Sequence, residues 1–416
     1  MRPLAFDDPT FDYQTRRAAA YATYRGAELG EVLATVDGAE DGEGVEDGDY
    51  VGWYVAWRAT ADRVAGEAES ALAAGHEETA RDALLRASNY YRTAEFFLGP
   101  DDPRRLPTYE RSRETFRAAL PLLDAAAREV EVPYEGRTLP GYLFEPASSS
   151  TSSTSSPSPS AEARPTVVAV GGFDAIAEEL YFLCGVPAAL ERGYAVLAFD
   201  GPGQGAPLRY DGLTARPDWE AVVGPVLDFL GDEPTVDDDR TALLGASMGG
   251  YYAPRAAAFD DRVAACVAFD HCLGVWEAAT FGKESVASLV EQVPGPVVNA
   301  VASLRARLDP GARWQLRNSE WVFGVDAAGL SATLKEYSLV DVADRIECPT
   351  LVLAGEDDHL MPLPLAYELV DRLGGEAELR VFTREEGAAD HCQVGNLSLA
   401  HGVVYDWLDE TLGRGS

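Results

Sequence analysis

The stretch Thr241–Phe259, TALLGASMGGYYAPRAAAF, places a serine between a short apolar run and an alanine-rich run. The first run predicts a strand and the second a helix. A serine at such a sharp turn has strained backbone angles, so its neighbours two positions away must be small, and Gly245 and Gly249 meet this condition. A bare G-x-S-x-G also occurs in ordinary turns. The strand–turn–helix context nevertheless favours Ser247 as the nucleophile of a nucleophile elbow.

A serine nucleophile needs a general base, and that base needs an acid to hold its tautomer. The chain has five histidines. His76 lies in an N-terminal helical region, His271 follows a strand before any acid could be placed, and His359 adjoins an acidic pair. His401 falls inside the last amphipathic stretch, which favours a packing or surface role. His391, in a loop-like stretch just before that last helix, is therefore the predicted base.

The acid of such a triad should follow another strand, between the serine and the histidine in chain order. The apolar run 350–354 predicts that strand, and GEDDHLMP follows it at 355–362. Asp358 is the favoured acid, and Asp357 is the alternative. These carboxylates could also form a solvated turn in an acid-rich chain, but the strand end and the chain order both fit a catalytic role.

The oxyanion of an attacked carbonyl needs backbone donors, usually the amide after the nucleophile and one from the turn after an earlier strand. Met248 provides the first. The second donor is expected in Gly171–Asp174, GGFD, which follows the apolar run 166–170, and Phe173 is the favoured amide. The paired glycines could equally form a plain turn.

The charge of the chain limits its partners. It has 34 basic and 69 acidic residues, a formal net charge of −35, which makes binding to nucleic acid or an anionic membrane unfavourable. Lys283 and Lys335 are the only lysines. A GC-rich genome can replace lysine by arginine but does not create this surplus of acids, so we expect a halophilic protein whose carboxylate self-repulsion is screened by salt.

The ends and cysteines of the chain indicate a cytoplasmic protein. The first residues, MRPLAFDD, do not form a basic start followed by an apolar run, and no segment approaches the roughly 18 apolar residues of a membrane span. The five cysteines are odd in number, lack C-x-x-C spacing and are expected to be reduced. Cys392 beside His391 does not make a metal site without a second ligand cluster. We expect no metal and no cofactor, since DGPGQG at 200–205 lacks the spacing of a dinucleotide loop.

The N-terminal part is predicted to be a helical domain over residues 1–128. Apolar residues recur at spacings of three and four over 53–72 and 80–98, and each run predicts one amphipathic helix. A third helix is expected over 108–130. The acidic, glycine-containing stretch 37–49 is expected to be a loop.

Residues 129–416 are predicted to form an α/β catalytic domain. A hairpin is expected at 130–134 and 141–144, and the serine-rich segment 148–160 predicts a flexible surface insert. Strands then alternate with helical stretches such as 178–192, which implies a mostly parallel sheet with helices on both faces. The remaining expected strands are 166–170, 195–199, 241–244, 263–269, 350–354 and 378–382. The aromatic-rich helical stretch 271–340 is expected to be a lid that lines an apolar pocket.

Four motifs carry a more specific resemblance: ASNYYRTAEFF at 87–97, GGFD at 171–174, DGPGQG at 200–205 and DHCQ at 390–393. With the elbow, the chain resembles the α/β-hydrolase superfamily, and within it the group that contains dihydroxypseudooxynicotine hydrolase and the fermentation-respiration switch protein. The resemblance implies an α/β-hydrolase fold with a helical N-terminal domain and a helical lid insertion. It covers most of the chain outside the serine-rich insert.

The resemblance implies Ser247 as nucleophile, Asp358 as orienting acid and His391 as base, and a homodimer with the helical N-terminal part in the cap or interface. Members of the group cleave esters or a carbon–carbon bond next to a ketone. In the carbon–carbon cleaving relative a glutamate in the pocket assists, and Glu277 lies in the corresponding region.

The sequence therefore predicts a metal-independent serine hydrolase that acts on a small or medium apolar carboxylic ester or activated ketone. The alternatives are a carbon–carbon bond hydrolase of the dihydroxypseudooxynicotine hydrolase type, a peptidase for small amides, and a non-catalytic regulatory protein that binds a partner.

Overall fold

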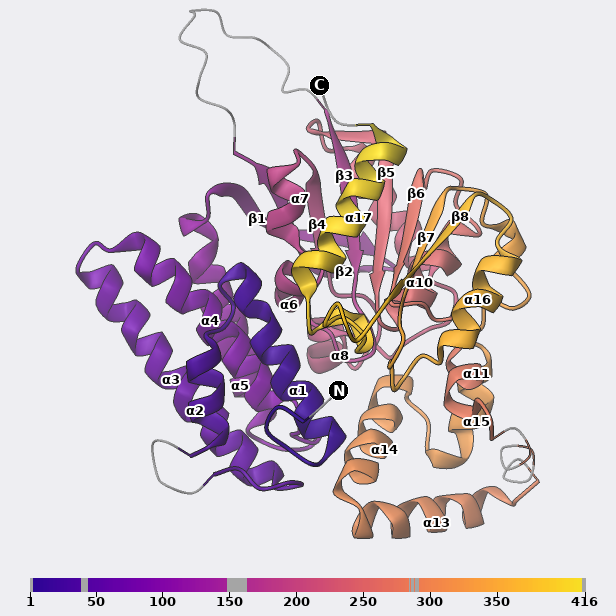
Figure 1. The fold of residues 1–416 in the computed structure, drawn as a ribbon, viewed down its shortest axis with the longest axis horizontal. Helices are drawn as coiled ribbons and strands as arrows, with labels where there is room; N and C mark the ends of the chain where they lie inside the picture. The colour runs from indigo at the N-terminus through magenta and orange to yellow at the C-terminus, as the bar shows by residue number, and fades with distance from the viewer. Residues whose placement is uncertain are drawn as a thin grey trace, which may run out of the picture. The chain divides into compact units, whose positions relative to one another are not determined.

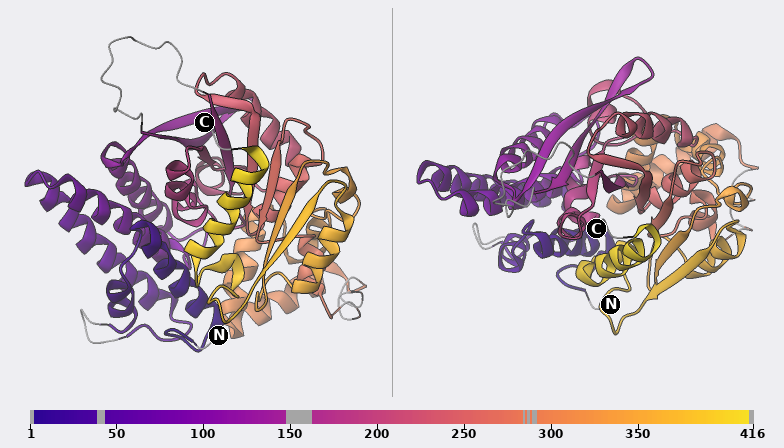
Figure 2. Two further views of the ribbon diagram at one scale, coloured as in Figure 1. Left: turned by 45° about the horizontal axis from the view of Figure 1, so that its top comes forward. Right: turned by 90° about the horizontal axis from the view of Figure 1, so that it is seen from above.

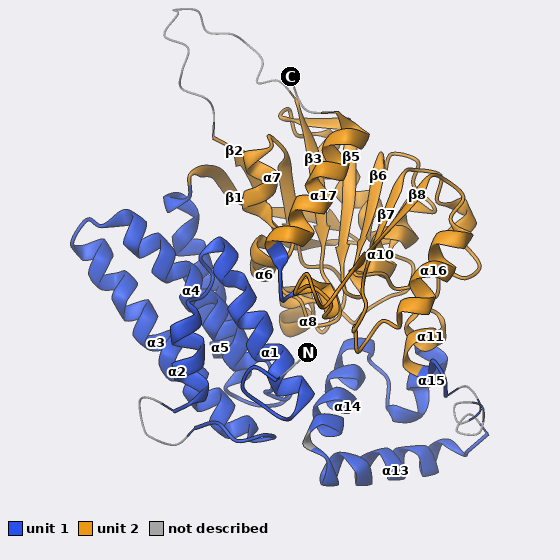
Figure 3. Ribbon diagram, viewed as in Figure 1, with its two compact units in different colours: residues 1–123, 280–334, 394–397 blue, residues 124–279, 335–393, 398–416 orange. Residues whose placement is uncertain are grey.

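The computed structural model describes residues 3–38, 44–147, 163–283, 285, 288 and 292–413. The chain folds as two compact units (Figure 3). Unit 1 comprises residues 1–123, 280–334 and 394–397, and unit 2 comprises 124–279, 335–393 and 398–416. The predicted serine-rich insert at 148–160 lies outside the described residues.

Unit 1 is helical. Its first helices pack around aromatic side chains: the ring of Phe97 lies 4.6 Å from that of Phe11 and 5.1 Å from that of Trp53. Trp314 joins this cluster, because its ring stacks on Phe96 at 4.6 Å and its indole donates to the Phe96 carbonyl. The helices of this unit are α1 (Pro9–Ala20), α2 (Leu29–Val36), α3 (Tyr50–Ala73), α4 (Glu77–Glu95), α5 (Arg105–Ala119), α13 (Gly295–Leu308), α14 (Pro310–Phe323) and α15 (Ala327–Lys335).

The expected helix over 108–130 is wrong in its second half. Helix α5 ends at Ala119, a short 3₁₀ turn follows at Leu120–Leu122, and Ala125–Tyr134 is the first strand. Pro121 cannot donate the next helical hydrogen bond. Beyond it, exposed and buried residues alternate along the last part of the strand, as on a half-buried sheet edge.

Unit 2 contains one sheet in which eight of the described strands run in the order β1-β2-β4-β3-β5-β6-β7-β8 (Figure 1). Strands β1 and β2 form an antiparallel hairpin, β2 pairs antiparallel with β4, and the pairs from β4 to β8 are parallel. The α/β class and the mostly parallel sheet are confirmed. The strands are β1 (Ala125–Tyr134), β2 (Arg137–Pro146), β3 (Arg164–Val170), β4 (Ala195–Phe199), β5 (Val236–Ala246), β6 (Ala265–Phe269), β7 (Thr350–Gly355) and β8 (Ala377–Phe382).

Helices cover both faces of this sheet (Figure 2). Helices α9 and α10 share one face, where Arg255 pairs with Glu220. Helices α6 and α17 meet on the other, where the Tyr405 hydroxyl donates to the Cys184 carbonyl. The helices of unit 2 are α6 (Ala177–Leu183), α7 (Val186–Glu191), α8 (Gly205–Asp211), α9 (Glu220–Gly231), α10 (Gly249–Ala257), α11 (Val275–Thr280), α16 (Leu363–Arg372) and α17 (Leu397–Leu412).

The expected single helix over 178–192 is instead the pair α6 and α7. Gly185 separates them in a left-handed conformation, with φ of 64°. A Cβ on Gly185 would lie 2.6 Å from His401 Nδ1, so the break leaves room for the buried His401 ring, whose Nε2 lies 2.9 Å from the Leu183 carbonyl oxygen. His401 therefore packs in the core of unit 2.

Within the described ranges, every helix is too short or too polar to cross a lipid bilayer.

Candidate active site

Ser247 lies at the turn between β5 and α10. Its φ is 60°, a left-handed conformation that is unusual for a residue with a side chain. A Cβ on Gly245 would lie 1.9 Å from the Gly249 carbonyl oxygen, and one on Gly249 would lie 2.4 Å from the Val170 carbonyl oxygen. The turn therefore requires glycine on both sides of the serine, which is the steric condition of a nucleophile elbow.

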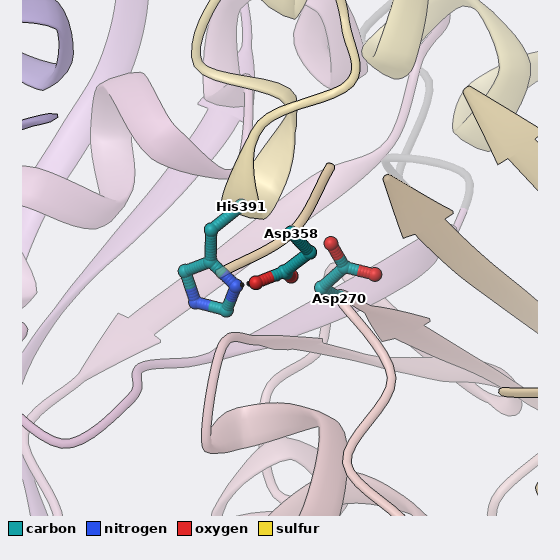
Figure 4. A group of neighbouring side chains, drawn as sticks. All are labelled: Asp270, Asp358 and His391. Carbon is teal, nitrogen blue, oxygen red and sulfur yellow. Dashed lines mark hydrogen bonds and ion pairs between the residues drawn. The ribbon is translucent and has the colours of Figure 1, made fainter. Parts of the chain in front are cut away.

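The structure brings Ser247, His391 and Asp358 together from three separate strand ends. His391 Nε2 lies 2.8 Å from Ser247 Oγ, and His391 Nδ1 lies 2.6 Å from Asp358 Oδ2 (Figure 4 shows the latter pair). A carboxylate only accepts, so Nδ1 carries the proton in this arrangement and Nε2 accepts from the serine hydroxyl. The side chains of His391 and Asp358 are 3% and 0% exposed. This geometry suits proton transfer from the serine.

Asp358 and Asp357 have different surroundings. The amides of Leu360 and Met361 donate to Asp358 Oδ1 at 2.7 and 2.9 Å, which fixes the carboxylate while its other oxygen meets His391. Asp357 pairs with the exposed Arg384. Of the two candidates, the structure places Asp358 against the histidine.

Burial and charge set the protonation of this pair. Burial acts to raise the pKa of Asp358, but the charge of His391 and the hydrogen bonds to the carboxylate lower that pKa below its ordinary value. Burial acts to lower the pKa of His391, but the charge of the Asp358 carboxylate outweighs burial and raises that pKa well above its ordinary value. The carboxylate thus favours the protonated form of His391.

The turn 171–174 lies against the elbow. A Cβ on Gly172 would lie 2.8 Å from Ser247 Cβ and 3.1 Å from the Met248 amide nitrogen, so this turn reaches the first amide after the serine. Phe173 is the next residue of the same turn. The structure therefore brings together the segments that hold both expected oxyanion donors.

Gln204 holds this turn in place, a role that the sequence analysis missed. The buried Gln204 side chain donates to the carbonyls of Gly171 and Gly172 at 2.6 and 3.1 Å. Asp200 accepts a hydrogen bond from the amide of Ala206, at the start of α8. The compact DGPGQG motif at 200–205 was the available signal, since such a glycine-rich loop after a strand implies close packing near the site.

A second buried carboxyl group, Asp270 after β6, was also missed. One of its carboxylate oxygens lies within 4.8 Å of a carboxylate oxygen of Asp358 and of a ring nitrogen of His391 (Figure 4). Gln393 Nε2 donates to Asp270 Oδ2 at 3.0 Å. Three such residues could suggest a metal centre. However, the Nδ1–H of His391 donates to Asp358 and has no lone pair left for a metal ion. Hydrogen bonds from His391 and Gln393 hold Asp358 and Asp270, respectively.

Glu277 lies in α11 and accepts a hydrogen bond from the Ser338 hydroxyl at 2.9 Å. Its other oxygen, Oε2, is buried without a hydrogen-bond partner in the described part of the chain. A buried carboxylate oxygen without a hydrogen-bond donor costs free energy of folding.

The five cysteines are free thiols.

The comparisons with known proteins agree with this fold. The alpha/beta hydrolase family model matches residues 167–404. The chain is 38% identical to "Hydrolase LUC6" of Fusarium sp over 429 residues, and 35% identical to "20-hydroxy-prefusarin hydrolase FUS2" of Gibberella moniliformis over 423 residues. The first alignment covers 98% of both chains, and the second covers 98% of this chain and 97% of the relative.

Among solved structures, 2,6-dihydroxy-pseudo-oxynicotine hydrolase matches with a TM-score of 0.70 and 25% identity. The match covers 94% of this chain and 95% of that protein. A structure named "AbyA5 Wildtype" has a TM-score of 0.64 at 18% identity, covers 95% of each chain and shares the fold.

Proposed function

Since the chain belongs to the alpha/beta hydrolase family, we propose that it is a serine hydrolase that cleaves a carboxylic ester or a related activated carbonyl compound through Ser247, His391 and Asp358. The observation that carries the proposal is the chain of two short contacts, from Ser247 Oγ to His391 Nε2 and from His391 Nδ1 to Asp358. Relatives along the whole chain are named hydrolases, which supports the reaction class.

In the proposed acylation step, Ser247 Oγ attacks the substrate carbonyl carbon while His391 Nε2 takes the hydroxyl proton. Asp358 stabilises the resulting imidazolium, and the amides of Met248 and Phe173 donate to the oxyanion. The tetrahedral intermediate then expels the alcohol, which receives the proton from His391. The product is an acyl-enzyme with the acyl group on Ser247.

Deacylation repeats these roles with water as the nucleophile. His391 takes a proton from the water, the hydroxide adds to the acyl carbon, and Ser247 leaves with the proton that His391 returns. The carboxylic acid departs and the enzyme regains its starting state. Every proton is moved by His391, so the proposed mechanism uses no metal and no cofactor.

The substrate class is proposed from the names of relatives and the aromatic lid expected from the sequence. Both 20-hydroxy-prefusarin and 2,6-dihydroxy-pseudo-oxynicotine, named in two of the matches, are small organic molecules. A small or medium apolar substrate is consistent with them. We further propose that the protein is cytoplasmic, which the free thiols support. We also propose that it forms a homodimer, which the family resemblance supports.

The second candidate is hydrolysis of a carbon–carbon bond next to a ketone. The buried Oε2 of Glu277 supports it, because this atom has no hydrogen-bond partner among the described residues and a polar group of a substrate would supply one. A panel of aryl esters, amides and diketones, tested at molar KCl with the wild type and Glu277→Gln, separates the two reactions. Selective loss of diketone cleavage in Glu277→Gln supports the second reaction, and turnover of esters alone supports the first.

The proposed function is tested by Ser247→Ala with short-chain aryl esters in molar KCl. We expect turnover to fall by about 10⁴-fold or more, since removing a triad serine leaves only binding and oxyanion stabilisation. Ester hydrolysis by Ser247→Ala at the wild-type rate would contradict the mechanism.

A further inference from the structure

Asp270 and Asp358 are two carboxyl groups in one buried site. Asp270 is fully buried, the Asp358 side chain is 0% exposed, and their oxygens lie within 4.8 Å of each other (Figure 4). Two carboxylates this close and this poorly solvated cannot both be ionised at little cost, because a single imidazolium balances only one of them. The site therefore favours one anion and one neutral acid.

The hydrogen bonds decide which of the two is the anion. Asp358 accepts from two backbone amides and from His391. Asp270 accepts from one amide, that of His271 at 3.0 Å, and from Gln393 Nε2 at 3.0 Å. Asp358 is the better stabilised carboxylate, since three donors surround it and one of them carries the positive charge when protonated.

The groups around Asp270 add no further cation. Burial lowers the pKa of His271 to about 4, so its ring is neutral near pH 7. The ring of His359 lies 6.3 Å from that of His391, and desolvation together with the charge of His391 lowers the pKa of His359 to about 4. Burial raises the pKa of the Cys272 thiol far above neutrality. The Cys392 sulfur lies 3.7 Å from the Phe269 carbonyl oxygen, to which its thiol donates. Among the described titratable groups next to this pair, His391 is thus the one that can balance a carboxylate.

We propose, building on the function proposed above, that Asp270 is the protonated member of this buried carboxyl pair and acts as a positioning residue for the triad. As a neutral acid held by Gln393 and the His271 amide, it packs beside Asp358 and leaves that residue as the sole anion facing His391. Burial and the neighbouring Asp358 charge both raise the pKa of Asp270 well above its ordinary value, which agrees with this geometry. The hydrogen bonds that hold Asp270 come from the His271 amide and Gln393, so its proposed action on the triad runs through Asp358.

The proton on Asp270 can be detected without any activity assay. We expect the infrared difference spectrum of wild type minus Asp270→Asn, at neutral pH and in molar KCl, to contain the C=O stretching band of a protonated carboxylic acid. Asp357→Asn is the matched control, because it removes an ionised surface carboxylate that pairs with Arg384. Its difference spectrum should lack that band. Absence of the band in the Asp270→Asn difference would show that Asp270 is ionised and would overturn the proposal.

The positioning role is tested by comparing two substitutions at residue 270. Asp270→Asn keeps the shape and the neutral charge, so we expect kcat within about threefold of wild type and an unshifted pH profile. Asp270→Ala removes the side chain that supports Asp358, and we expect kcat to fall by about 100-fold with little change in KM, the loss typical of a misplaced catalytic group. Equal losses in the two variants, or full kcat in Asp270→Ala, would overturn the role.

These outcomes are separable from failure of the proposed function. If the wild type neither hydrolyses esters nor reacts with a fluorophosphonate, the serine hydrolase mechanism fails, while the infrared band still reports where the proton lies. If Asp270→Ala does not fold, the spectrum and kinetics of Asp270→Asn still decide between a neutral and an ionised Asp270.

Discussion

Ser247 has two properties that an ordinary surface serine lacks. Its backbone is left-handed at the end of β5, and its Oγ lies 2.8 Å from an imidazole nitrogen. The imidazole is in turn held by Asp358, whose second oxygen is fixed by two amides. Each group in this series is positioned by the next, so in the proposed mechanism the reactivity of the serine depends on His391 and on the groups that hold Asp358.

The pH dependence of kcat/KM follows from His391. The Asp358 charge outweighs burial and raises the pKa of His391 above the ordinary 6.5. A protonated His391 cannot take the serine proton, so we expect kcat/KM to fall as pH decreases through a value above 6.5. A pH–rate profile with aryl esters checks this, and an acid limb centred below pH 6.5 would contradict it.

Asp358 and Asp357 should respond very differently to the same substitution. Asp358→Asn removes the charge that stabilises the imidazolium and permits the wrong tautomer, so we expect kcat to fall by about 10⁴-fold. Asp357→Asn breaks only an exposed ion pair and should leave kcat unchanged. Steady-state kinetics of both variants decides between them, and a larger loss in Asp357→Asn would assign the acid to that residue.

The sequence could not choose firmly between these two aspartates. Both follow the same strand, and the choice depends on which side chain the turn at 355–362 directs inward. The place of Asp270 in the site could not be predicted from the sequence, for a different reason. It lies beside Asp358 because β6 and β7 are neighbours in the sheet, although a long helical segment separates them in the chain.

The elbow is the element on which the site depends, and its glycines are under steric constraint. A Cβ on Gly245 would lie 1.9 Å from the Gly249 carbonyl oxygen, whereas a Cβ on Gly66, in the middle of α3, would meet nothing within 4 Å.

We expect Gly245→Ala to lower the free energy of unfolding by about 3 kcal/mol, the upper range for overpacking. Gly66→Ala, as the control, should raise it by about 0.5–1 kcal/mol because alanine favours the helix. Chemical denaturation of both variants measures the difference, and equal stability of the two variants would contradict the steric account of the elbow.

Sequence patterns identified elements well where a periodic run ended at a glycine or proline turn. The elbow, the buried strands and the amphipathic helices of unit 1 are of this kind. The pattern failed where tertiary packing decided the outcome. Gly185 divides the expected helix 178–192 because the His401 ring, far along the chain, occupies the space beside it. The start of the strand at 125–134 was predicted as helix because it is alanine-rich and has high helix propensity, whereas its end at 130–134 was predicted as strand.

The whole molecule has a formal net charge of −35, which comes from a large surplus of carboxylates. Self-repulsion of these charges opposes the compact state at low ionic strength, and salt screens it, since the Debye length falls to about 3 Å at 1 M. We expect Tm to rise steeply from low to molar KCl. Sucrose at matched osmolality is the control for solute exclusion. An unchanged Tm between low and molar KCl would remove the halophilic interpretation.

The central claim is that Ser247 is a nucleophile activated by His391. Mass spectrometry of the intact protein after treatment with a fluorophosphonate, in molar KCl, tests it most directly and also separates an enzyme from a non-catalytic binding protein. We predict a single phosphonyl adduct, mapped to Ser247 by peptide analysis, that forms slowly in His391→Ala and is absent in Ser247→Ala. A wild-type chain that remains unlabelled, or an adduct on another residue, would contradict the account.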